Sequence, residues 1–397
     1  MIYGFYFRFY KYTKNRFVAA LLSKILNLLF RCVFFVKKAV RTKTTSNNMS
    51  HIEAKRIIEN ANSKNNVSPI FNNLPIDNEL DLSIVVPVYN YVNVLKENID
   101  SILNQKTKYK YEVILVDDGS TDGSNAVLQQ YSSYPNVKVI TQENGGIAYA
   151  RNTGINVSTG KYLMFVDCDD TVHDDIVESM MDEAYRENYD MVMCAHNLSK
   201  ENEECIISVI PNIYPCYNLL GYESESKIFN YAGLPWGKVF RRELWNDVRF
   251  FPGYWFEDSI IQFLIFTQIK TYSYLPKVLY EYRWYENNFS KTQGNNNNMK
   301  TIDRFWVLED MIERYEIMRL PLDNKFHTVL LTHLSIYYYP AFSNLDEKYI
   351  TALFTLARNI FLKYRFNDDE LPYMLRQVEK ALINDDCNLW KLASKYQ

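Results

Sequence analysis

The sequence predicts an α/β domain with a mostly parallel central sheet flanked by helices, followed by a smaller helical domain. Short, nearly continuous apolar runs alternate with helical stretches in the first half of the chain, which is typical of parallel strands covered on both faces. Polar clusters follow the ends of these runs, where such sheets bind ligands. Residues 299–397 show helical periodicity instead, with apolar side chains such as Phe305, Leu308, Ile312 and Tyr315.

The first half divides into four strand–helix units. We expect strands at residues 82–88, 111–116, 137–140 and 161–166, and helices at residues 92–104, about 124–132 and from Gly145-Gly146 through Asn152. The last strand leads into Asp167-Cys168-Asp169. Two carboxylates at a strand end offer hard oxygen ligands to a divalent cation, which would suit the diphosphate of a bound nucleotide.

The turn after the first strand excludes a dinucleotide-binding domain. Such a domain needs glycines there so that its backbone can approach a pyrophosphate. The turn here is Pro87-Val88-Tyr89-Asn90, without glycine. A nucleotidyltransferase that makes nucleotide sugars would also need a glycine-rich basic loop at this place, so it is only an alternative.

Six motifs in order carry a resemblance to a known family. They are SIVVPVYN (83–90), VDDGSTD (116–122), ENGGIAYARN (143–152), FVDCDD (165–170), WGKVFRRE (236–243) and FED (256–258). The set resembles the family 2 glycosyltransferases over residues 81–290, a little over half of the chain. The resemblance implies a GT-A fold, which is a Rossmann-like α/β fold, an inverting mechanism and a nucleotide-sugar donor, most often a UDP-sugar.

The resemblance assigns the donor nucleotide to the first two strand ends. Tyr89 would stack on the base, with Pro87 and Asn90 in the same motif, and Asp118 would accept the uracil N3–H. An aromatic side chain packed at a strand end is the alternative for Tyr89. For Asp118 the alternative is turn chemistry, because its neighbours hydrogen-bond readily to their own backbone. Asp122 is predicted to cap the following helix.

The resemblance also implies a diphosphate and metal site. Arg151 would contact the donor diphosphate, although a solvated helix face is an equal interpretation. Asp169 would ligate Mn2+ or Mg2+, and Asp167 would face the ribose or the metal. Residues 171–174 are predicted to form a capping box that begins the next helix.

On the acceptor side, the resemblance makes Asp258 the general base that deprotonates the acceptor hydroxyl. Glu257 would contact or orient the acceptor, and adjacent carboxylates should raise the pKa of one of them. The alternative is a pair of acids favoured by a helix N-terminus. Trp236 and Lys238 would form the acceptor-side wall, where the indole could stack on a sugar. An inactive nucleotide-binding scaffold would be expected to lose Asp169 or Asp258, and both are present.

Residues 280–284 resemble part of a Q-x-x-R-W motif found in processive members of the family. Tyr280 stands at the glutamine position, so we expect a transferase that adds one or a few sugars. Arg283 and Trp284 would still contact the acceptor. An aromatic strand with an exposed arginine is an equal interpretation.

The N-terminal segment, residues 1–43, is basic and amphipathic. Residues 1–50 contain ten Lys or Arg and no Asp or Glu, although the whole chain has a formal charge of −3. Lys24, Arg31 and Lys38 recur every seven residues opposite an apolar helix face. This pattern predicts binding to an anionic membrane surface, without a spanning helix or signal peptide. Packing on the protein itself, or a translation start at Met49, are the alternatives.

The remaining segments complete the predicted organisation. Residues 44–80 are predicted to form a polar linker with a short helix near His51 to Ala61. Residues 81–290 are predicted to form the α/β domain, and residues 291–397 the helical domain. The helical domain is also the predicted contact of a homodimer. The six cysteines have neither C-x-x-C nor metal-site spacing, so we expect reduced thiols in the cytoplasm, on the inner face of the cell membrane. No nucleic-acid partner is expected. A surface polysaccharide is the expected product, but the sequence identifies neither sugar nor acceptor.

Overall fold

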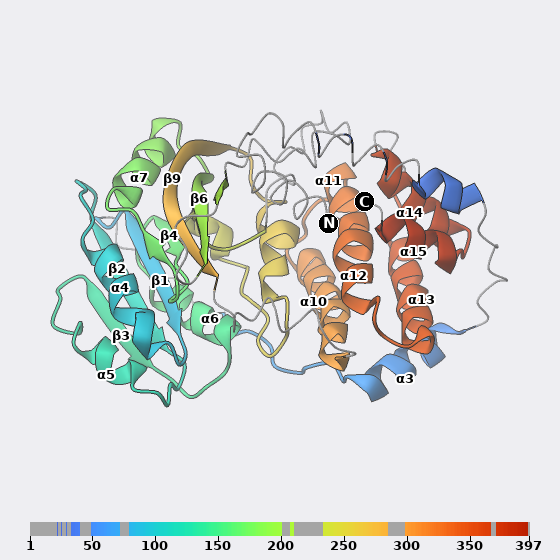
Figure 1. Cartoon of the computed structure of the whole chain (residues 1–397), viewed down its shortest axis with the longest axis horizontal. Helices are drawn as coiled ribbons and strands as arrows, with labels where there is room; N and C mark the ends of the chain where they lie inside the picture. The colour runs from blue at the N-terminus through green and yellow to red at the C-terminus, as the bar shows by residue number, and fades with distance from the viewer. Residues whose placement is uncertain are drawn as a thin grey trace. The chain divides into compact units, whose positions relative to one another are not determined.

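The computed structural model describes residues 33–39, 49–71, 79–200, 207–209, 233–284, 298–366 and 371–395, together with positions 22, 25 and 29. The chain forms two compact units (Figure 1). The sheet unit comprises Asn66–Ile213 and Ala232–Glu286, and the helical unit comprises Met1–Asn65, Tyr214–Tyr231 and Asn287–Gln397.

The first half of the sheet unit confirms the predicted alternation of strands and helices. Its elements are β1 (Leu82–Val88), α4 (Val92–Leu103), β2 (Tyr111–Asp117), α5 (Ser124–Gln129), β3 (Val137–Thr141), α6 (Ile147–Val157) and β4 (Tyr162–Phe165). These strands pair in parallel in the order β3-β2-β1-β4. Only α5 is clearly shorter than expected.

The second half of this unit extends the sheet with strands of both directions. Strand β8 pairs antiparallel with β4 and β6, and the long β9 runs parallel to β6 and curves beside it (Figure 1). The elements are β5 (Thr171–Val172), α7 (Ile176–Arg186), β6 (Met191–Lys200), β7 (Ile207–Val209), β8 (Lys238–Arg241), η3 (Arg242–Trp245), η4 (Glu257–Ser259), η5 (Ile261–Ile265) and β9 (Tyr272–Trp284).

The capping box predicted at residues 171–174 is wrong. Thr171 and Val172 form β5, which pairs antiparallel with Glu281 and Tyr280 of β9. Helix α7 begins only at Ile176. The pairing partner lies far along the chain, so the local Thr-x-x-Asp pattern could not reveal it.

Alternating side chains of β1 serve the two faces of the sheet. Ile84, Val86 and Val88 belong to the buried cluster that also contains apolar residues of α4 and α7. Val85 faces the opposite way, towards α6, where a Cβ added to Gly154 would lie 2.3 Å from Val85 Cγ1. Glycine therefore allows α6 to pack closely on β1, and this fixes the position of the side chains that α6 presents to the site.

The helical unit includes a helix from the segment interpreted as a linker. Its elements are α3 (His51–Ala61), η6 (Met299–Ile302), α10 (Asp303–Ile317), α11 (Asn324–Thr332), η7 (His333–Tyr337), α12 (Tyr338–Phe342), α13 (Glu347–Lys363), α14 (Tyr373–Ile383) and α15 (Cys387–Lys395). Helix α3 packs on α13 and buries Ala54 and Ile58. The expected short helix is present, but it is part of this unit's core.

The N-terminal segment is described only in part. Lys24 and Arg31 lie outside the described residues, whereas positions 22, 25, 29 and 33–39 are helical. Ile25, Leu29, Val33 and Val36 are 41–63% exposed, while Phe34 is buried and contacts Tyr373 edge-on. Within the described ranges, no helix has the length and apolar character needed to cross a membrane.

Candidate active site

The polar segments that follow β1, β2 and β4 meet at one edge of the sheet. Because these strands are parallel and adjacent, their carboxyl ends lie together. Tyr89-Asn90 follows β1, Asp118 follows β2, and Asp167 to Asp170 follow β4. This edge therefore gathers most of the residues predicted to bind the donor.

Asn90 joins the first two loops and leaves Tyr89 open. Its side-chain oxygen accepts a hydrogen bond from the Thr121 N–H (2.8 Å), and its own N–H donates to Ser120 Oγ (3.1 Å). Pro87 is buried in β1, whereas the Tyr89 side chain is 46% exposed. Tyr89 is thus not a packed core aromatic, and its ring can be reached by a ligand.

Asp118 is committed to a turn. Its Oδ1 accepts from Gln142 Nε2 (2.7 Å) and the Gly145 N–H (3.0 Å), and its Oδ2 accepts from the Gly146 N–H (2.7 Å). The side chain is only 2% exposed. This is the turn chemistry left open by the sequence, and a contact with a donor base would require the carboxylate to be uncovered.

The residues around Asp118 are also structural. Gly119 has φ +73°, and a Cβ there would lie 2.9 Å from the Asn144 backbone nitrogen, so glycine is required. Asp122 accepts hydrogen bonds from the first N–H groups of two helices, Val92 of α4 (2.9 Å) and Ser124 of α5 (2.9 Å). The cap position of α5 itself is Gly123.

The turn at 167–170 is held by hydrogen bonds that the sequence did not predict. Asn98 of α4 donates through Nδ2 to the carbonyls of Asp167 (3.0 Å) and Asp170 (2.7 Å). The buried Asp170 accepts from the Tyr280 hydroxyl (2.7 Å) and the Arg283 N–H (2.8 Å). Asp170 therefore anchors the turn to β9, and no local pattern could have identified these partners.

Asp167 and Asp169 fit a divalent cation by their chemistry. Burial and the charge of Asp167 raise the pKa of Asp169 to about 6, although a hydrogen bond from Tyr91 acts against this. A cation would relieve this excess of negative charge. Across the described ranges, no group of three or more His, Cys, Asp or Glu side chains is arranged to hold a metal ion. Two carboxylates suffice where substrate phosphates and water complete the coordination.

Arg151 lies at the centre of a buried charge network. It is 3% exposed and bridges two carboxylates, with Nη2 at 2.9 Å from Asp167 Oδ1 and Nη1 at 2.8 Å from Glu257 Oε1. Its guanidinium also lies over the Phe250 ring, 5.2 Å from the centroid. The solvated-face interpretation of Arg151 is therefore wrong, and in this structure its two Nη groups contact protein carboxylates.

Asn152 fixes the segment that leads to the predicted base. Its side chain donates to the Phe250 carbonyl (2.7 Å) and accepts from the Phe250 N–H (2.9 Å). Further along, Phe256 adopts φ +67°, a left-handed conformation that is strained for a bulky residue. Glu257 and Asp258 follow in the 3-10 turn η4.

Glu257 shows the raised pKa expected for one member of this pair. Burial raises the pKa of Glu257 to about 7, with Arg151 lowering it and the charge of Asp258 raising it. The helix N-terminus that was the alternative for these acids is instead the 3-10 turn η4, followed by the π-helical η5. The two acids therefore do not simply begin an α-helix.

The expectation that Trp236 offers its ring to an acceptor sugar is contradicted. The indole is 6% exposed and stacks on Tyr280 and Tyr282, with ring centroids 4.8 and 5.1 Å away. Lys238 is likewise 6% exposed, and its Nζ donates to the Leu234 carbonyl (2.9 Å). Burial lowers the pKa of Lys238 to about 8. Both side chains are therefore interior, Trp236 against the tyrosines of β9 and Lys238 against the backbone of its own segment.

Arg283 forms a bidentate ion pair with Glu97 of α4. It therefore ties β9 to α4 in this structure, and its predicted acceptor contact stays a prediction. Trp284 ends β9, but its side chain lies outside the described residues.

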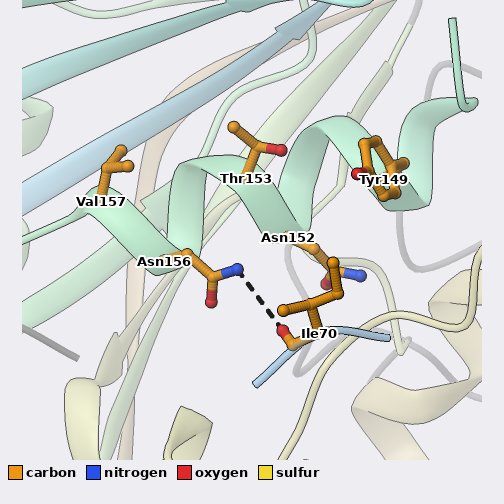
Figure 2. Close-up of a pocket in the computed structure, with 6 residues that line it drawn as sticks. All are labelled: Ile70, Tyr149, Asn152, Thr153, Asn156 and Val157. Atoms are coloured by element: carbon orange, nitrogen blue, oxygen red, sulfur yellow. Dashed lines mark hydrogen bonds between the residues drawn. The ribbon is translucent and has the colours of Figure 1, made fainter. Parts of the chain in front are cut away.

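A separate pocket of about 230 Å³ lies against α6 (Figure 2). It is lined by Ile70, Tyr149, Asn152, Thr153, Asn156 and Val157. Figure 2 shows Asn156 donating to the Ile70 carbonyl, at 3.4 Å. The lining offers amide and hydroxyl groups but no carboxylate, so the pocket is distinct from the charge network.

Comparison with known proteins identifies similar sequences. A family model described as Glycosyl transferase family 2 matches residues 83–228. Glycosyltransferase GlyG from Streptococcus pneumoniae serotype 4 is 30% identical over 209 residues, covering 50% of this chain and 69% of GlyG.

Two further relatives also match about half of the chain. The uncharacterized glycosyltransferase YibD from Escherichia coli K12 is 30% identical over 213 residues, covering 50% of this chain and 60% of YibD. Glycosyltransferase GlyA from the same Streptococcus strain is 29% identical over 208 residues, covering 48% of this chain and 29% of GlyA. The matches thus span less than two thirds of YibD and GlyA.

Among solved structures, TarS 1-349 from S. aureus in complex with UDP has a similar fold. The TM-score is 0.53 at 18% identity, covering 80% of this chain and 90% of that one. At this identity the likeness concerns the fold alone.

Proposed function

This chain belongs to glycosyltransferase family 2 and has the GT-A fold, and from this we propose that it is an inverting glycosyltransferase. The donor is a nucleotide sugar, a UDP-sugar in the first instance. The acceptor is a glycan or lipid-linked glycan in the synthesis of a surface polysaccharide.

The observation that supports this proposal most is the grouping of four carboxylates around one buried arginine. Asp167 and Glu257 both contact Arg151, Asp169 adds its charge beside Asp167, and Asp258 is adjacent to Glu257. A structural ion pair would need one carboxylate, whereas this cluster keeps surplus negative charge at the ligand-binding edge of the sheet. Perturbed carboxylates in such a place indicate chemistry.

In the proposed reaction, an acceptor hydroxyl oxygen attacks the anomeric carbon of the donor sugar. Asp258 takes the hydroxyl proton, and the bond from the anomeric carbon to the diphosphate oxygen breaks with its electron pair leaving on the diphosphate. Attack from the far side inverts the configuration. We assign the base to Asp258 from the resemblance to the family, and Glu257, which Arg151 contacts at 2.8 Å, to orienting the acceptor.

Asp167 and Asp169 would hold a divalent cation, Mn2+ or Mg2+. When bound, such a cation neutralises charge on the departing diphosphate. Tyr89 is the residue best exposed to stack on the donor base.

The direct test is UDP release from UDP-glucose, UDP-galactose and their N-acetyl forms with Mn2+, with and without candidate acceptors. Asp258→Asn should lower turnover by about 100-fold or more, as expected for loss of a general base, and leave the affinity for UDP unchanged. Glu243→Gln, an exposed acid outside the cluster, is the matched control. A fully active Asp258→Asn protein would remove this assignment.

We further propose that the N-terminal segment binds an anionic membrane surface. The exposed residues Ile25, Leu29, Val33 and Val36 are spaced three or four apart, so they share one helix face. The surrounding sequence is basic without any acid in residues 1–50. An apolar face within a basic segment complements anionic lipid headgroups above acyl chains.

Sedimentation with vesicles tests this second proposal. The protein should bind vesicles that contain anionic phosphatidylglycerol more than neutral phosphatidylcholine vesicles, and Val33→Glu should weaken the binding. Ile317→Glu, on an exposed apolar residue of α10, should not. Equal binding to both lipids would contradict the proposal. Location at the cytoplasmic face of the cell membrane and a homodimer through residues 291–397 stay predictions.

A further inference from the structure

Arg151 contacts carboxylates from both sides of the proposed reaction. Asp167 belongs to the proposed donor site, and Glu257 adjoins the proposed base, yet the same guanidinium binds both at 2.9 and 2.8 Å. No hydrogen bond joins Asp167 and Glu257 directly among the described residues. Because both carboxylates contact the same guanidinium, a change in the charge of one alters how Arg151 pairs with the other.

The surroundings of Arg151 make this shared contact sensitive to change. The side chain is 3% exposed, so its charge interactions are weakly screened by water. Asn152 holds the backbone of Phe250, and Gly154 holds α6 against β1, so the helix cannot easily move away. The Arg151 Nε is buried without a hydrogen-bond partner in the described structure, so this N–H group can donate a further hydrogen bond.

We propose that Arg151 is a positioning residue that couples donor binding at Asp167 to the charge of Glu257. This inference rests on the proposed function, because it takes Asp167 as part of the donor site. When the bound donor engages the Asp167 carboxylate, Arg151 pairs more fully with Glu257. When Glu257 loses its charge, Arg151 pairs more fully with Asp167 and competes with the donor for it. Thermodynamic linkage requires the two effects to be equal.

The first test measures UDP affinity by calorimetry in the presence of Mn2+ at pH 8. Glu257→Gln should weaken the binding of UDP by about fivefold or more, the lower end of usual coupling between sites. In an Arg151→Met background the same substitution should have no effect. The control Glu178→Gln removes an acid of α7 outside the network and should leave the affinity unchanged.

Three outcomes are distinguishable. An unchanged affinity in Glu257→Gln, or an equal loss in the Arg151→Met background, overturns the inference while leaving the proposed function intact. Failure of the wild-type protein to bind UDP overturns the proposed donor instead.

A second test needs neither ligand nor metal. The urea midpoints of Asp167→Asn, Glu257→Gln and the double variant report whether the two carboxylates interact. The double variant removes both carboxylates that contact Arg151 and leaves the more distant charge of Asp258, so its midpoint should fall by more than the sum of the two single shifts. The excess should vanish in the Arg151→Met background. Additive shifts with Arg151 present would overturn the inference, whatever the ligand is.

Discussion

Replacing Arg151 by Met is the perturbation whose consequences the structure defines best. Methionine keeps much of the side-chain length but leaves Asp167 and Glu257 without their shared cation. The two carboxylates have side-chain exposures of 23% and 12%. Removing one partner of a buried ion pair costs about 3 to 5 kcal/mol. Because Asp167 is partly exposed, we expect a loss near the lower end, about 3 kcal/mol at pH 8.

The loss should depend on pH in a defined direction. Burial raises the pKa of Glu257 to about 7 in the intact protein, so Glu257 is charged at pH 8 and protonated at pH 5.5. Without Arg151 its pKa should rise further, and the carboxyl should remain protonated at pH 8. At pH 8, one unit above the wild-type pKa of Glu257, ionisation of Glu257 stabilises the wild-type protein by about 1.4 kcal/mol relative to the variant. At pH 5.5 Glu257 is protonated in both proteins, so the loss of unfolding free energy in Arg151→Met should be about 1.4 kcal/mol smaller there.

Urea unfolding of wild type and Arg151→Met at the two pH values measures both quantities. The control is Arg186→Met, which removes an exposed arginine paired with Glu183 on α7 and should leave the unfolding free energy unchanged. A loss below about 1 kcal/mol at pH 8 would refute the view that Arg151 compensates buried charge. A loss independent of pH would refute the role given to Glu257.

Three further predictions follow from the same contacts. Burial raises the folded-state pKa of Glu257 from 4.5 to about 7, so its ionisation opposes folding. The wild-type unfolding free energy should therefore fall by up to about 3 kcal/mol from pH 4.5 to 7. In urea titrations, the unfolding free energy of Glu257→Gln should not show this decrease. Gly154→Ala should lower stability by about 1 to 3 kcal/mol in thermal unfolding, since its Cβ would overlap Val85; an unchanged melting temperature would contradict the close packing of α6. Asp169→Ala should weaken UDP binding in calorimetry with Mn2+ present and not in its absence; equal weakening in both would contradict the metal role.

The strands that build the ligand-binding edge were predictable because their signals are local. Each of β1 to β4 is a short apolar run followed by polar residues, and the parallel order of such runs brings their ends together. The family motifs then named the carboxylates, because their order along the chain is specific even where each motif is not.

The partners of those residues could not be predicted, because they lie far apart in sequence. Arg151 contacts Asp167, 16 residues away, and Glu257, 106 residues away, so the sequence left open whether it was solvated. Trp236 looked suited to a sugar, but tyrosines of β9 stack on it and bury it. In both cases tertiary packing decided the environment of a side chain whose local sequence was ambiguous.

A crystal structure of the protein soaked with UDP and Mn2+ tests the central claim most directly. We expect one metal ion between the carboxylates of Asp167 and Asp169 and the UDP diphosphate, with the uracil against Tyr89 and Asp258 facing the sugar side. UDP bound elsewhere, or a metal that touches neither carboxylate, would contradict it.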